Sequence, residues 1–233
     1  MKKLLVAIIV AFLLFPVTAS AKVLTFDDLP DPNPSGLPAG PIPVDYGGLT
    51  WSSHFWYTNS SALEDFLGLP QTGFSNGVVS PPHVAANDQG LQISVSNCTF
   101  DFNGAYLTAA INENLQITVE GLSNGVVKYS ETVTVGPYEP TWFDFNFMDI
   151  DELVFSSFGG MPAFETGWTQ EETTIFVIDD FTFNEEGTSA CNADYNGDDV
   201  VNWRDRIVKL RDMFKEYRKW VKECWRPARR SSR

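Results

Sequence analysis

The sequence predicts a mainly β protein, an antiparallel β-sandwich followed by a C-terminal calcium loop and one amphipathic α-helix. Three observations support this fold class. Many short segments alternate apolar with polar residues. Turn residues separate these segments every ~8–12 residues. No helical pattern of the length that joins parallel strands lies between them. The chain has 233 residues, enough for one sizeable domain and a small appendage.

The N-terminus has the composition of a secretory signal peptide. A Met-Lys-Lys start precedes an apolar run over residues 4–17, and residues 19–21 are small. The run is shorter than the ~20 residues of a membrane-spanning helix, and no later stretch reaches that length. We expect cleavage near Ala21 and a secreted, extracellular or cell-surface protein without a transmembrane anchor in the mature chain. The alternative is an uncleaved N-terminal anchor.

The charge is distributed unevenly. Residues 22–202 contain 2 lysines and 26 acidic residues, whereas residues 203–233 contain 12 basic and 4 acidic residues. An acidic body repels nucleic acid and attracts cations, so we expect no nucleic-acid partner. Three cysteines, Cys98, Cys191 and Cys224, are too few for a disulfide framework, although export permits a disulfide.

The expected elements follow from periodicity and turn residues. The prolines of segment 30–43 disfavour both a helix and the hydrogen bonds of a β-sheet. We expect a helical turn over residues 62–67 and a loop over residues 70–90. Asn103-Gly104 and Asn124-Gly125 are predicted hairpin turns. The predicted strands are 23–29, 49–57, 91–96, 98–102, 105–110, 114–120, 126–134, 141–147, 152–156 and 174–184.

Five segments make up the predicted domain organisation. They are a signal peptide (1–21), a β-sandwich (22–186), a linker (187–193), a loop-helix (194–226) and a basic tail expected to be disordered (227–233). An apolar stripe at helical spacing supports the helix. It comprises Ile207, Leu210, Phe214, Tyr217, Val221 and Cys224.

The start of the loop-helix has the spacing of a calcium loop. Calcium binds six to eight oxygens, which a 12-residue loop supplies from positions 1, 3, 5, 7, 9 and 12. Counted from Asp194, these positions are Asp194, Asn196, Asp198, Val200 (through its carbonyl), Asn202 and Asp205. The alternative is a turn with a helix cap, in which Asn202 is the N-cap.

The run DYNGDDVVNWRD resembles the calcium repeat of dockerins, an EF-hand type of loop without the entering helix. It has Asp199 where glycine is usual, and Asp205 where EF-hands have glutamate. Dockerins contain two such repeats, and we find one here. The resemblance covers about 20–25 residues, and it implies docking to another protein.

Two pairs of carboxylates bracket the predicted sandwich, Asp27-Asp28 near its start and Asp179-Asp180 near its end. With TFDDLP, YGGLTW, TWFDFNF and FVIDDFTF, they resemble jelly-roll carbohydrate-binding modules and the β-sandwich ectodomains of bacterial PEP-CTERM exported proteins. The resemblance implies a structural calcium bound by Asp27, Asp28 and Asp180. The alternative is that these carboxylates cap the ends of strands and are exposed to water.

Exposed aromatic residues are candidates for binding sugar rings. His54 and Trp56 share the less apolar face of segment 49–57, and Trp142 and Trp168 are further candidates. Aromatic faces stack on the apolar faces of sugars, and polar neighbours bind the hydroxyls. The alternative is that these side chains fill a core rich in phenylalanine.

Catalytic motifs are not found. The chain has two histidines and lacks G-x-S-x-G, HExxH and a glycine-rich phosphate loop. We therefore expect a non-catalytic, exported, calcium-binding β-sandwich protein that acts in adhesion or binds polysaccharide or matrix. One alternative is a protein-docking or structural module whose basic helix binds an exported partner. Another is a glycoside hydrolase, because carboxylates are plentiful.

Overall fold

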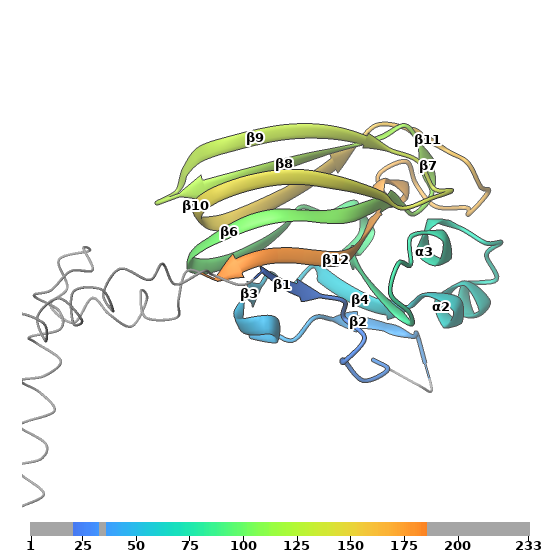
Figure 1. The fold of residues 1–233 in the computed structure, drawn as a ribbon. Helices are drawn as coiled ribbons and strands as arrows, with labels where there is room; N and C mark the ends of the chain where they lie inside the picture. The colour runs from blue at the N-terminus through green and yellow to red at the C-terminus, as the bar shows by residue number, and fades with distance from the viewer. Residues whose placement is uncertain (1–20, 33–35, 186–233) are drawn as a thin grey trace, which may run out of the picture. The chain divides into compact units, whose positions relative to one another are not determined.

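The computed structural model describes residues 21–32 and 36–185, and these residues form an antiparallel β-sandwich (Figure 1). The predicted fold class is confirmed for this part of the chain. Its long strands are β6 (Ile93–Ala109), β8 (Leu115–Ser123), β9 (Val126–Val135), β10 (Thr141–Phe158) and β12 (Phe176–Glu185). The shorter strands are β1 (Ala21–Leu24), β2 (Ala39–Pro41), β3 (Thr50–Trp51), β4 (Phe55–Asn59), β5 (His83–Asn87), β7 (Asn112–Glu113) and β11 (Met161–Pro162).

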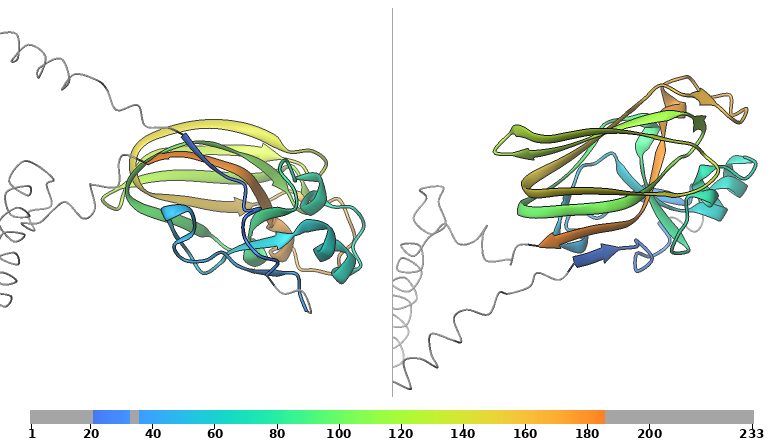
Figure 2. Two further views of the ribbon diagram at one scale, coloured as in Figure 1. Left: turned by 60° about the horizontal axis from the view of Figure 1, so that its bottom comes forward. Right: turned by 45° about the horizontal axis from the view of Figure 1, so that its top comes forward.

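The strands pair in the order β2-β4-β5-β12-β6-β10-β8-β9, while β1 joins β12, β3 joins β6, and β7 pairs separately with β11. The β1–β12 register places Ala21 opposite Asn184. Strands β6 and β10, of 17 and 18 residues, pair along most of their length, with shifts of register near Phe147 and Ile150. Figure 2 shows β8, β9 and β10 as a layer over the part of the sheet that contains β12 and β1.

Phenylalanine side chains fill the main core between these layers. Phe102 of β6 is fully buried, and its ring centroid lies 4.8 Å from that of Phe181 and 5.3 Å from that of Phe145. Each fully buried side chain of this size contributes about 1.5–3 kcal/mol of transfer free energy. Trp51 is also buried, and its ring centroid lies 4.7 Å from that of Phe55. This tryptophan therefore belongs to the core.

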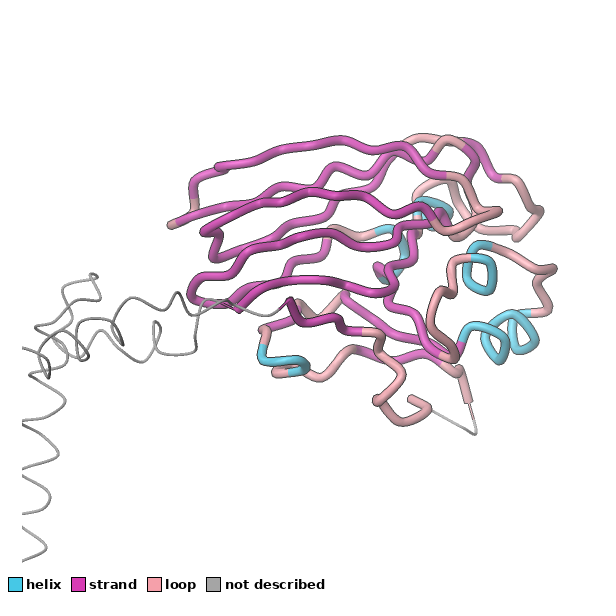
Figure 3. The backbone as a smooth tube through the Cα atoms, viewed as in Figure 1, coloured by secondary structure: helices cyan, strands magenta, loops and turns pink. Residues whose placement is uncertain are grey.

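Two helices, α2 (Ser60–Leu67) and α3 (Gly73–Asn76), lie together at one end of the strands (Figure 3). The predicted turn at 62–67 is confirmed as part of α2, which begins after Asn59, whose side chain accepts a hydrogen bond from Ala62 N. It ends at Gly68 in a left-handed conformation. The helices cover a second apolar cluster that includes Leu63, Phe74 and Ile175.

Helix α3 was not predicted, because segment 70–90 is rich in glycine and asparagine. The helix forms because Thr72 caps it by accepting a hydrogen bond from Phe74 N. Gly73 lets it approach the sheet: a Cβ at this position would lie 1.7 Å from the carbonyl oxygen of Ala109. The glycine that indicated a loop is therefore a close-packing residue.

Several predicted element boundaries are wrong. Asn103-Gly104 is no hairpin turn but lies within β6; Gly104 is needed there because a Cβ would lie 2.3 Å from the Phe143 carbonyl oxygen. The proline-rich segment contributes β2, a short edge strand in which proline is tolerated. Strand β1 ends at Leu24, and Phe26 takes a left-handed conformation, which places Asp27 after the strand.

The second predicted hairpin is confirmed. Asn124 and Gly125 have φ angles of 52° and 72°, the left-handed values that a two-residue turn of type I′ requires. They join β8 to β9, with Ser123 opposite Val126.

The predicted signal peptide, apart from Ala21, lies outside the described residues, as do the predicted linker 187–193, the predicted calcium loop 194–205 and the helix and tail predicted after it. Between residues 21 and 185, neither helix has the length and hydropathy needed to cross a membrane.

Candidate functional site

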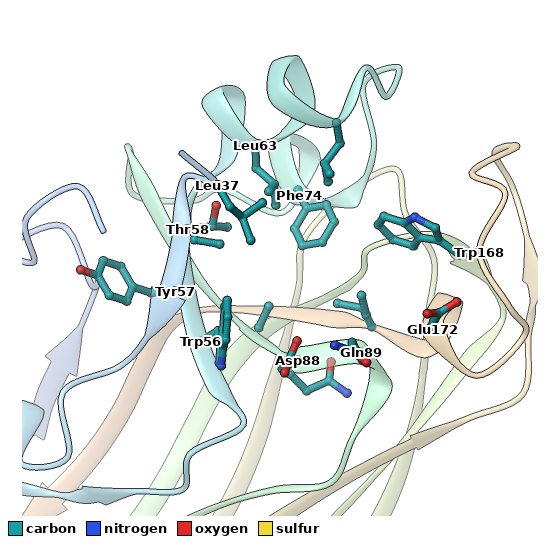
Figure 4. A pocket seen from close by; sticks show the side chains of 15 residues that line it. Leu37, Trp56, Tyr57, Thr58, Leu63, Phe74, Asp88, Gln89, Trp168 and Glu172 are labelled. Carbon is teal, nitrogen blue, oxygen red and sulfur yellow. The ribbon is translucent and has the colours of Figure 1, made fainter. Parts of the chain in front are cut away.

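A cavity of about 300 Å³ lies between the two helices and strands β4 and β5 (Figure 4). Leu63 and Leu67 of α2, Phe74 of α3 and Ile175 form apolar walls. The remaining lining consists of Leu37, Ala39, Trp56, Tyr57, Thr58, Ala86, Asn87, Asp88, Gln89, Trp168 and Glu172. The cavity therefore combines an apolar interior with aromatic and carboxylate side chains.

Trp56 and Trp168 are the two indoles of this cavity. In Figure 4 they lie on opposite sides of it, with Asp88 and Gln89 between them in this view. Strand alternation directs Trp56: its neighbours Phe55 and Tyr57 are buried, so Trp56 projects from the other face of β4. Its Nε1 donates to the Ser53 carbonyl oxygen at 3.2 Å, which fixes the indole and leaves its ring face for contacts.

Asp88 and Gln89 belong to the 3₁₀ turn η2 (Asp88–Gly90), which packs against a second such turn, η3 (Glu172–Thr174). Gly90 has a φ of 73°, and a Cβ there would lie 2.3 Å from Thr174 Oγ1. Gln89 has a φ of 52°, an uncommon conformation for a residue with a side chain. In this conformation the Gln89 side chain lies at the cavity.

Two carboxylates contribute negative charge to the cavity. Glu172 Oε2 accepts a hydrogen bond of 2.7 Å from Thr169 N, and Thr169 Oγ1 accepts one from Glu172 N, as in a capping box. Two hydrogen bonds with Thr169 lower the pKa of Glu172. The bond with the Thr169 backbone has the larger effect and the bond with its side chain the smaller one. Asp88 Oδ2 lies 3.7 Å from His54 Nδ1.

Other polar residues of the lining are already satisfied within the protein. Asn87 donates to Leu91 O and Ser157 Oγ and accepts from Phe176 N. Thr58 Oγ1 donates to Pro38 O at 2.6 Å. The groups that remain for a ligand are therefore Asp88, Gln89, Glu172 and the two indole faces.

The four aromatic candidates from the sequence are placed differently. Trp56 and Trp168 line the cavity. His54 does not line it, but lies beside Asp88, and its side chain is 51% exposed. Trp142 lies elsewhere: its ring packs edge-on against Tyr106, and its Nε1 donates to Asp144.

Asp88, Gln89 and Glu172 were missed by sequence reasoning. The Asn87-Asp88 pair indicated a loop, and the T-x-x-E spacing from Thr169 to Glu172 is a local capping signal. The two segments meet because β5 pairs with β12. Neither local pattern contains information about this pairing.

Two of the three carboxylates of the predicted second calcium site, those of Asp27 and Asp180, lie beside segment 79–83. Asp27 Oδ1 accepts from His83 N at 3.0 Å, and Asp180 Oδ1 accepts from Ser80 Oγ at 3.0 Å. Asp28 Oδ1 instead accepts from Tyr46 Oη at 2.6 Å. Within the described ranges, no group of three His, Cys, Asp or Glu side chains is placed to hold a metal ion. The site of Asp27, Asp28 and Asp180 stays a prediction.

Asp179, beside that site, is fully buried. Its Oδ2 accepts from Val79 N at 2.7 Å and from Ser80 N at 2.9 Å, so this carboxylate holds segment 79–80 against β12. Burial raises its pKa to about 6, although the hydrogen bonds from Ser80, Val79 and Asp180 act in the opposite direction.

No family model matches the chain, and no curated protein matches it. Among solved structures, a DUF4465 family protein from Bacteroides caccae shares 12% identity over 58% of this chain and 78% of that chain, with a TM-score of 0.40. TmCBM61 in complex with β-1,4-galactotriose shares 10% identity over 60% of this chain and 90% of that chain, with a TM-score of 0.37. At these TM-scores neither likeness assigns a function to the chain.

Proposed function

We propose that the β-sandwich is a non-catalytic carbohydrate-binding module and that a sugar binds in the cavity lined by Trp56 and Trp168. One observation carries the proposal: these two indoles, distant in sequence, line one cavity together with side chains that can hydrogen-bond a ligand. The sugar would lie against an indole face, where its C–H groups meet an apolar surface. Asp88, Gln89 and Glu172 would then accept or donate hydrogen bonds to its hydroxyls.

The size of the cavity supports a small ligand or the end of a longer chain. Ligand sites typically enclose ~300–1,000 Å³ and combine apolar walls with a few polar groups. The cavity, at about 300 Å³, is at the lower end of this range. We therefore propose that it holds one or two sugar units of a polysaccharide.

The state of Glu172 suits the binding of a sugar. Its hydrogen bonds with Thr169 lower the pKa of the carboxyl group, so this side chain can accept hydrogen bonds from hydroxyls.

Calorimetric titration of the full chain with a panel of oligosaccharides tests the proposal. We expect Trp56→Ala and Trp168→Ala each to weaken binding at least ~10-fold, because truncating an aromatic anchor of a binding site typically costs ~2 kcal/mol or more. Trp142→Ala is the matched control and should bind as the unaltered protein does, since Trp142 contacts Tyr106 away from the cavity. Equal loss in all three variants, or no binding to any oligosaccharide, would contradict the proposal.

We propose further that the protein is exported after cleavage near Ala21 and binds calcium. The Met-Lys-Lys start, the apolar run over residues 4–17 and the small residues 19–21 support export. The proposed calcium sites are the loop from Asp194 to Asp205 and the cluster of Asp27, Asp28 and Asp180. N-terminal sequencing of protein recovered from the culture medium tests the export; an N-terminus at Met1 would contradict it.

A further inference from the structure

Both charged side chains that line the cavity are acidic. Asp88 and Glu172 line it, and of the basic side chains in the described part of the chain only His54 lies within 4 Å of either carboxylate. That part contains two lysines and no arginine. Lys128 lies near Asp149 and the ring of Tyr129, and Lys22 near the ring of Phe183; neither lines the cavity.

The aromatic residues of the cavity also favour a cation. The face of an indole carries partial negative charge and attracts an ammonium group that lies over it, more strongly where water is excluded. The cavity has two indoles, and each is only partly exposed. Indoles combined with carboxylates bind a protonated amine through both its charge and its N–H donors.

We infer that the cavity selects glycans with a protonated amine, such as chains of glucosamine, over neutral glycans and over glycans that contain uronic acids. This inference rests on the proposed carbohydrate binding and names the substrate class. The sugar ring contacts Trp56 or Trp168, and its ammonium group donates to Asp88 or Glu172. A uronate is disfavoured because its carboxylate would enter a cavity that holds two carboxylates and no lysine or arginine.

The test compares three oligosaccharides of equal length by calorimetric titration of the full chain at about pH 6, where ordinary aspartate and glutamate side chains are ionised. The probes are a glucosamine oligomer, its N-acetylated form and a galacturonic acid oligomer. We expect the glucosamine oligomer to bind ~10-fold more tightly than the N-acetylated form, because charge-assisted hydrogen bonds are about twice as strong as neutral ones. The preference should shrink as salt is raised.

Two charge-removing variants identify the groups responsible. Asp88→Asn and Glu172→Gln keep the shapes of the side chains, and the amide introduced by Glu172→Gln keeps an oxygen that can accept from Thr169 N. We expect each variant to weaken binding of the glucosamine oligomer more than binding of the N-acetylated oligomer, so that the preference for the amine shrinks. Glu131→Gln, at an exposed position of β9, changes the net charge equally and should keep the full preference.

The outcomes separate this inference from the proposed function. Equal affinity for the amine and its N-acetylated form, with both lost in Trp56→Ala, overturns the selectivity and leaves carbohydrate binding intact. Competition by ethylammonium as effective as that by the glucosamine oligomer overturns the glycan class, because the site would then bind amines in general. Absence of binding to all three oligomers overturns this inference, and absence of binding to every oligosaccharide of the panel overturns both.

Discussion

Glu64 of α2 accepts two hydrogen bonds of 2.6 Å from Thr72, one from its backbone N and one from its Oγ1. The same carboxylate accepts from Ser75 Oγ. These bonds tie α2 to the start of α3, and the two helices supply Leu63 and Phe74 to the cavity. One buried carboxylate therefore holds an apolar wall of the proposed binding site.

Replacing Glu64 by alanine should lower the free energy of unfolding by about 1–3 kcal/mol, because buried donors lose a charged acceptor. Affinity for an oligosaccharide should fall as well, since α3 is no longer fixed against α2. Urea unfolding and calorimetric titration measure the two effects. Asp65→Ala, at the exposed next position, is the control and should change neither. Equal stability of the two variants would show that the Glu64 hydrogen bonds do not hold α3.

Gly90→Ala should disrupt the contact between η2 and η3. The new Cβ would lie 2.3 Å from Thr174 Oγ1 and 2.5 Å from the Glu171 carbonyl oxygen, so η2 must move, and Asp88 and Gln89 move with it. We expect a loss of stability of about 2–4 kcal/mol and at least ~10-fold weaker sugar binding.

Gly125→Ala is the control for Gly90→Ala. Gly125 has a similar φ of 72°, and a Cβ there would have no atom within 4 Å. This variant should cost only the ~1–2 kcal/mol of a left-handed backbone and should keep sugar affinity. Thermal unfolding and titration of both variants check the prediction, which fails if both bind sugar equally well.

The raised pKa of the buried Asp179 side chain should make the stability of the protein depend on pH. Its pKa is about 6 in the folded protein against 3.8 ordinarily, so the folded state keeps a proton that the unfolded state has lost between these values. The stability that protonated Asp179 provides is therefore lost as pH rises from about 4 to about 6. Relative to Asp179→Asn, the unaltered protein should lose about 3 kcal/mol across this range.

Urea unfolding of the unaltered protein and Asp179→Asn at several pH values, with a chelator present, measures this difference. Asp65→Asn serves as the control and should show no pH-dependent difference, because Asp65 is exposed. A difference for Asp179→Asn that stays constant or grows with pH would be the opposite of what burial of this carboxylate predicts.

Calcium binding is predicted for two separate sites. Asp194→Ala combined with Asp198→Ala removes two ligands of the loop, and we expect one fewer bound calcium per chain by metal analysis. Asp180→Ala combined with Asp27→Ala should remove a different ion. Unchanged stoichiometry in the first pair would exclude the loop as a site, and unchanged stoichiometry in the second would exclude the cluster in the sandwich.

The sandwich could be predicted because strand alternation is a local property. Phe55 and Tyr57 are buried and Trp56 between them is not, as the alternation of segment 49–57 predicts, and Asn124-Gly125 forms the turn that its composition demands. The candidate pocket was predictable only in part. Trp56 and Trp168 were among the four aromatic candidates, whereas His54 and Trp142, named with them, do not line the cavity.

The remaining features depend on contacts that periodicity does not encode. Gly73 and Gly104 resemble turn residues in sequence, yet both are glycine because backbone atoms of neighbouring strands approach them closely. Asp88 and Glu172 are remote in sequence and meet only because β5 pairs with β12. A single sequence gives no signal for such a meeting.

The pairing of Ala21 with Asn184 has a practical consequence. Strand β1 begins beside the end of β12. Helices α2 and α3 lie at the other end of the strands (Figures 1 and 2). A host protein could therefore accept residues 21–185 as a cassette within one of its surface loops, since adjacent ends suit domain insertion. The cassette would present Trp56 and Trp168 away from its host, which makes the sandwich a scaffold for a fused sensor.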